Sequence, residues 1–122
     1  MKKIMSMLVG LFAIGGANAD TEASMNFDLE NVKPFLSRLS KIVDSGINDQ
    51  KVNEMLLFTS SVPVEDQKDM EFTVVYKGKK TPIRYSVFMD DIDAPDLYFF
   101  TSPELATAIE SEMSKYSNEL GI

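Results

Sequence analysis

The stretch Met70–Thr101, MEFTVVYKGKKTPIRYSVFMDDIDAPDLYFFT, determines the fold that we predict from the sequence. Large apolar residues alternate with polar or smaller ones in two runs, which is the two-residue period of strands with one mainly buried face. The inward positions are Phe72, Val74 and Tyr76 in the first run and Ile83, Tyr85 and Val87 in the second. Between the runs, Gly78 permits the positive φ of a tight hairpin. Leu97–Thr101 predicts a third strand with aromatic rings on both faces.

Helices are expected on both sides of this stretch. Residues 32–43 place apolar side chains at the spacing of one helix face, with Asn31 as the N-cap and Gly46 as the end signal. Residues 48–60 favour a second short helix, although their compact apolar run also suits a strand. Residues 102–104 (SPE) begin a third helix, because a capping hydroxyl, a proline at the first helical position and an acid near the positive dipole end favour a helix start.

This order of elements predicts an α+β fold. We expect a small antiparallel sheet of three strands, or slightly more, packed by an N-terminal helix or helix pair and by a C-terminal helix. Residues 20–30 are polar and acidic, and we expect them to be a mobile lead-in to the first helix. Residues 20–122 are enough for one domain with its own core.

Residues 1–19 have the features of a secretory signal peptide. Lys2 and Lys3 precede an apolar stretch of 11 residues, and Ala17-Asn18-Ala19 is a small-x-small cleavage site. That stretch is shorter than the roughly 20 residues that span a bilayer. Cleavage after Ala19 removes two of the 12 basic residues and none of the 19 acidic ones, so the net charge changes from −7 to −9. We therefore expect an acidic bacterial protein of the periplasm.

Composition excludes several classes of chemistry. The chain has no Cys and no His, so it has no thiol nucleophile, no imidazole base, no thiolate metal site and no disulfide. An acidic chain is a poor binder of phosphate backbones, which require clustered Lys and Arg. We expect a protein that is not an enzyme, uses no cofactor or metal, and binds neither nucleic acid nor, after signal cleavage, a membrane.

Four aspartates lie close together between the second and third predicted strands, at positions 90, 91, 93 and 96. A calcium loop fits poorly, because Pro95 interrupts the alternation and the twelfth position from Asp91 is Ser102 rather than Glu. A glycosidase pair needs one acid in an apolar setting, and adjacent loop aspartates show no such asymmetry. Two interpretations remain open, a solvated turn and a protruding acidic loop that recognises another protein.

The recognition hypothesis assigns partner binding to Asp90, Asp91, Asp93, Asp96 and Tyr98. Acids beside exposed aromatic rings suit entry into a basic cleft. A basic group lies at the other end of the second strand, roughly 30 Å away, and this group also suits a solvated hairpin. It comprises Lys77, Lys79, Lys80 and Arg84.

The aromatic run after the acids also fits two roles. Tyr98, Phe99 and Phe100 suit a core strand, while the outward rings need a cover that a homodimer would supply. The segment with Met25 and Phe27 is a rival contact surface.

Taken as a whole, the mature chain resembles the small periplasmic immunity proteins of type VI secretion systems. The resemblance lies in the leader MKKIMSMLVGLFAIGGANA, the mature length and the stretch YSVFMDDIDAPDLYFFTSPEL. It is greatest to those that neutralise a spike effector with a peptidoglycan-hydrolysing (muramidase) extension. The resemblance implies a homodimer that binds the effector's lysozyme-like domain and occludes its glycan cleft, and it transfers no functional residue.

Two other functions stay open at this point. The sheet and helices could form the pocket of a periplasmic small-ligand or envelope-stress binding module. A carboxylate-dependent glycosidase is the third class, and it would rely on the acids alone.

Overall fold

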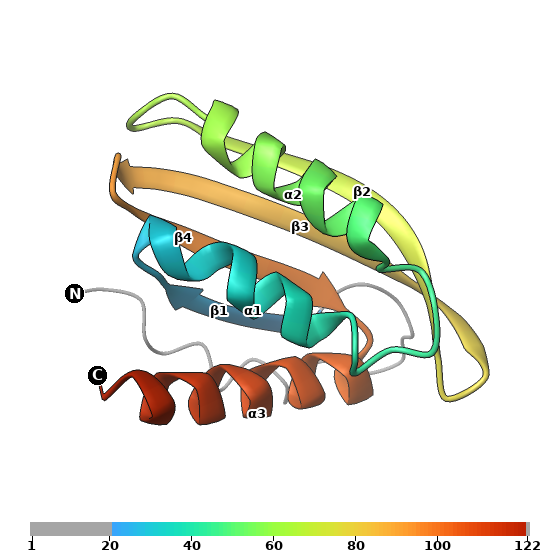
Figure 1. Cartoon of the computed structure of the whole chain (residues 1–122). Helices are drawn as coiled ribbons and strands as arrows, with labels where there is room; N and C mark the ends of the chain where they lie inside the picture. The colour runs from blue at the N-terminus through green and yellow to red at the C-terminus, as the bar shows by residue number, and fades with distance from the viewer. Residues whose placement is uncertain (1–20, 122) are drawn as a thin grey trace.

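The computed structural model describes residues 21–121 and shows a four-stranded sheet packed by helices (Figure 1). The predicted signal peptide, residues 1–19, lies outside the described residues. Between residues 21 and 121, no helix is both long enough and apolar enough to cross a membrane. The elements are β1 (Thr21–Asn26), the 3-10 helix η2 (Leu29–Asn31), α1 (Val32–Leu39), α2 (Asp49–Ser61), β2 (Gln67–Tyr76), β3 (Lys79–Asp91), β4 (Ala94–Thr101) and α3 (Pro103–Leu120).

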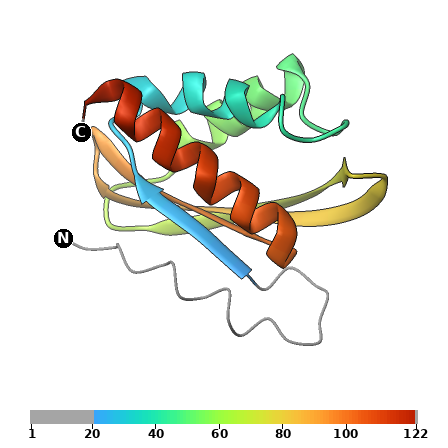
Figure 2. The same ribbon diagram turned by 90° about the horizontal axis from the view of Figure 1, so that it is seen from below.

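The predicted α+β fold is confirmed. The strands are antiparallel and follow the order β1-β4-β3-β2, so the sheet has four strands, which agrees with the predicted three or slightly more. The helices α1, α2 and α3 lie on the same side of the sheet (Figure 2). Gly78, at a φ of 79°, makes the tight turn between β2 and β3 as its sequence context predicts.

Aromatic packing joins the helices to the sheet. Phe99 of β4 is fully buried, with its ring centroid 5.0 Å from that of Tyr85 on β3 and 6.2 Å from that of Phe35 on α1. Phe35 also contacts Phe27 at 4.8 Å and Tyr116 of α3 at 6.1 Å. Such ring pairs add to the free energy gained from burial alone, and they hold α1, α3 and the Phe27 segment against one face of the sheet.

The mobile lead-in predicted for residues 20–30 is wrong for the residues described. Thr21–Asn26 form the edge strand β1, which pairs with β4 from Thr21↔Thr101 to Asn26↔Asp96. Phe27 follows the strand and is 1% exposed, so it belongs to the core and is no contact surface. The alternation in this strand is weak, because the buried positions Thr21 and Ala23 are small and Met25 is the strand's one large apolar residue.

The first helix is shorter than predicted, and the second helix is confirmed. Helix α1 ends at Leu39, and Asn31 makes no side-chain capping bond. Gly46 does not end the helix; it lies against β2, where a Cβ would come within 2.6 Å of the Val74 Cα atom. Helix α2 begins after Asn48, whose side chain accepts a hydrogen bond from the Lys51 backbone N–H.

A buried hydroxyl pair predicts how stability depends on pH. The Tyr85 hydroxyl lies 2.6 Å from the Thr59 hydroxyl, which donates to the Met55 carbonyl and therefore accepts from Tyr85. Burial raises the pKa of Tyr85 above its ordinary value. Because the unfolded chain ionises this phenol first, the free energy of unfolding should fall as pH rises above about 10.

The variant Tyr85→Phe tests this expectation. It should cost about 1 kcal/mol at neutral pH and make the alkaline loss of stability shallower, as measured by urea unfolding between neutral and strongly alkaline pH. Thr59→Val should cost more at neutral pH, about 1–3 kcal/mol, because it leaves the buried Tyr85 hydroxyl without its acceptor. An alkaline slope in Tyr85→Phe equal to that of the wild type would contradict the assignment.

Candidate functional site

The predicted acidic loop is a tight β-hairpin turn. Strand β3 continues through Asp91 and β4 begins at Ala94, so only Ile92 and Asp93 lie between the strands. The Asp91 carboxylate accepts a hydrogen bond from the Asp93 backbone N–H at 3.0 Å, which stabilises the turn. The structure therefore presents these acids on a narrow hairpin tip, where the sequence left a solvated turn and a protruding acidic loop open.

The five predicted partner-binding residues fall into three environments. Asp90, Asp91 and Asp93 are exposed around the tip, and Ile92 beside them is 62% exposed. Asp96 is only 4% exposed. Tyr98 is partly exposed on β4, on the face of the sheet away from the core. Three of the aspartates thus share a surface, while Asp96 is mainly structural.

Asn26 links β1 to this hairpin. Its side-chain Nδ2 atom donates to the Asp96 carboxylate at 2.6 Å and to the Ala94 carbonyl at 2.8 Å. The chain after β1 continues the contact, because Phe27 N–H donates to the Pro95 carbonyl and Leu29 N–H to the Asp93 carbonyl. The N-terminal segment therefore holds the base of the acidic turn in place. Sequence reasoning missed Asn26 because only the strand pairing reveals its partners.

Asn26→Ala should destabilise the fold and loosen the turn. It leaves the buried Asp96 carboxylate without its side-chain donor, so we expect a loss of about 1–3 kcal/mol in urea unfolding. Asn53→Ala, at an exposed position on α2, is the matched control and should change stability by no more than about 0.5 kcal/mol. Equal stability of the two variants would show that Asn26 does not hold the hairpin.

Further acids join the tip from distant parts of the sequence. Glu65 N–H donates to the Met89 carbonyl, and Met89 N–H donates to the Asp66 carbonyl, so the chain before β2 runs beside the end of β3. Val64 lies in the same segment and is 50% exposed. We call this surface the acidic end. Its exposed acids are Asp28, Glu30, Glu65, Asp66, Asp90, Asp91 and Asp93.

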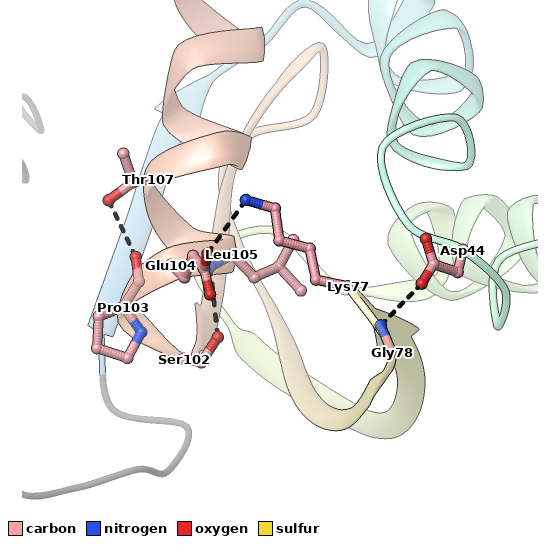
Figure 3. Close-up of polar contacts among 8 residues, drawn as sticks. All are labelled: Asp44, Lys77, Gly78, Ser102, Pro103, Glu104, Leu105 and Thr107. Carbon is pink, nitrogen blue, oxygen red and sulfur yellow. Dashed lines mark hydrogen bonds and ion pairs between the residues drawn. The ribbon is translucent and has the colours of Figure 1, made fainter.

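The opposite end of β3 is basic, and it is held by one acid of α3 and one acid of the connection between α1 and α2 (Figure 3). Lys77 Nζ lies 3.2 Å from the Glu104 carboxylate at the start of α3, and the Gly78 N–H donates to the Asp44 carboxylate. The hydrogen bond and charge of Glu104 raise the pKa of Lys77. Since β3 has 13 residues, the two ends lie about 40 Å apart. The Lys77 charge is paired, whereas within residues 21–121 no Lys or Arg forms an ion pair with Glu65, Asp66, Asp91 or Asp93.

The second surface is the face of the sheet opposite the helices, which we call the open face. Tyr98 and Phe100 are partly exposed there, with nearly parallel rings whose centroids are 6.3 Å apart. The Arg84 guanidinium lies over the Phe100 ring at 4.3 Å and forms an ion pair with Asp69 at 3.3 Å. No described helix covers this face (Figures 1 and 2).

Carboxylates surround Tyr98. Burial raises the pKa of Tyr98, and the negative charges of Asp96, Glu22 and Asp90 raise it further. These acids come from β4, β1 and β3, so three strands contribute negative potential around one phenol. A cation approaching this ring would be attracted by both the carboxylates and the aromatic face.

Neither comparison with known proteins nor a metal-binding geometry assigns a function to these surfaces. Protein-family models, curated proteins and solved structures give no match to this chain. Within the described residues, no group of three or more acids has the arrangement of a metal site.

Proposed function

We propose that this chain is an exported immunity protein that binds a muramidase effector of a type VI secretion system. In this proposal it inhibits the enzyme sterically, by occluding the glycan-binding cleft. The observation that carries the proposal is the acidic end, where a narrow hairpin tip with exposed Ile92 lies among seven exposed acids from three segments.

The charge of this end supports binding to a basic partner. Enzymes that act on the anionic cell wall gain from a positive surface, and a complementary negative surface speeds their encounter with an inhibitor. The basic end supports the same orientation, because Lys77 already forms an ion pair with Glu104 and the Gly78 N–H already donates to Asp44. The molecule would therefore approach a cationic cleft with the tip of β3 and β4 first.

The geometry of the tip supports a steric mechanism. Ile92 gives it an apolar point, and Val64 adds a second exposed apolar side chain on the same end. Hydrogen bonds from Asn26, Phe27 and Leu29 fix the hairpin before binding. A preordered tip loses little conformational entropy when it enters a cleft, so more of the contact energy appears as affinity.

Inhibition of a purified muramidase effector domain tests the proposal. The mature chain, residues 20–122, should abolish peptidoglycan hydrolysis at stoichiometric excess and should form a complex visible by size-exclusion chromatography. Full hydrolysis in the presence of excess mature chain would refute the proposed function.

The triple variant Asp90→Asn, Asp91→Asn, Asp93→Asn tests the acidic end. We expect the association rate to fall about tenfold at low salt and to lose much of its salt dependence. The matched control is Asp49→Asn, Glu54→Gln, Glu110→Gln, which removes the same charge from the helices. Stopped-flow or surface-plasmon kinetics measure both rates, and equal rates in the two triple variants would exclude a local role for the tip.

The proposed export has its own measurement. Expressed in a Gram-negative host, the full chain should yield a periplasmic protein whose N-terminal sequence begins Asp20-Thr21. The described fold begins at Thr21, so cleavage after Ala19 leaves β1 complete. Recovery of uncleaved protein from the cytoplasm alone would contradict export.

A further inference from the structure

The open face has the composition of a protein-binding surface. Its central side chains, Tyr98, Phe100 and Arg84, are of the types enriched in binding hot spots, with Phe88 alongside on β3. The register makes one row of Glu22, Phe100, Arg84 and Glu71 across the four strands. An apolar and aromatic centre is thus bounded by acids on both edge strands.

Arg84 prepares this centre for contact. Its guanidinium covers the Phe100 ring at 4.3 Å while its charge is paired with Asp69. The Arg84 guanidinium therefore contributes a flat surface, and its positive charge is paired with the Asp69 carboxylate. With Glu22, Glu71, Asp90 and Asp96 on the same face, the net sign around Tyr98 stays negative, as the carboxylates that raise the pKa of this phenol indicate.

The charge decides between two possible occupants. A second copy of this chain, placed face to face, would bring two negatively charged surfaces together, because Glu22, Glu71 and Asp90 lie on this face and Arg84 is already paired with Asp69. A partner that presents Lys or Arg would instead find carboxylates next to aromatic rings, which suits cation–π contact and ion pairing together. The face therefore fits a basic protein surface.

The open face is continuous with the acidic end. Along β4, Asp96, Tyr98 and Phe100 lead from the hairpin tip across the middle of the sheet on one face. Successive residues on a face are about 7 Å apart, so Phe100 lies roughly 20–25 Å from the tip. One partner surface can reach both regions.

We propose that the open face, centred on Tyr98, Phe100 and Arg84, docks against a basic surface of the muramidase beside its cleft. This inference rests on the proposed function and extends it. The acidic end accelerates encounter, and the open face slows dissociation, because fully desolvated aromatic and arginine contacts mainly set the lifetime of a complex.

Dissociation kinetics with the purified muramidase domain test the inference. The double variant Tyr98→Ser, Phe100→Ser should weaken binding at least 100-fold, mainly through faster dissociation, and should keep the salt dependence of association. The control is Leu57→Ser, which removes a large apolar side chain on α2 that is 72% exposed, and it should change affinity less than twofold. Circular dichroism and thermal melting confirm that each variant is folded.

A charge variant covers the case in which the double variant does not fold. Glu71→Lys places a cation on the rim of the open face and should weaken binding about tenfold, whereas Glu54→Lys on α2 makes the same charge change away from it and should not. If folded face variants bind like the wild type, the open face is not the docking surface, although the proposed function stands. A wild-type dimer that buries this face would also overturn the inference. If the wild type does not bind the muramidase, both proposals fail.

Discussion

The burial of Phe99 is the constraint on which the rest of the structure depends. Its ring lies between Tyr85 of the neighbouring strand and Phe35 of α1, and Phe35 in turn contacts Phe27 and Tyr116. Because side chains alternate along a strand, burying Phe99 sends its two neighbours to the opposite face. The same packing that assembles the core therefore creates the aromatic pair on the open face.

The acidic end depends on backbone pairing rather than on side-chain packing. Asp66 reaches it because Met89 donates to its carbonyl, and Asp93 is held because Leu29 donates to its own. These bonds hold acids from separate segments close together before any partner is present, so the acids repel one another. A partner with positive charge would relieve that repulsion, which gives this end a physical reason to bind one.

The sequence predicted the elements with strong periodicity and missed those without it. Strands β2 and β3 follow from alternating large residues, and α3 follows from its start signals at Ser102 and Pro103, where the Ser102 hydroxyl does accept from Leu105 N–H. Strand β1 was missed because two of its three inward residues, Thr21 and Ala23, are small. The sequence did not place the acids at 65 and 66 beside those at 90–93. Backbone hydrogen bonds between distant residues bring the two segments together, and such bonds leave no local pattern in the sequence.

The strand order has a consequence for when the chain can fold. Thr21, the first described residue, pairs with Thr101, so the earliest strand must wait for the last one before it has a partner. Contacts between such distant residues slow folding, because the chain loses the entropy of closing a long loop before strand pairing offsets that loss. If the chain is exported as proposed, the N-terminal strand crosses first and stays unpaired until β4 follows. The topology would then help to keep the polypeptide unfolded during passage through the membrane.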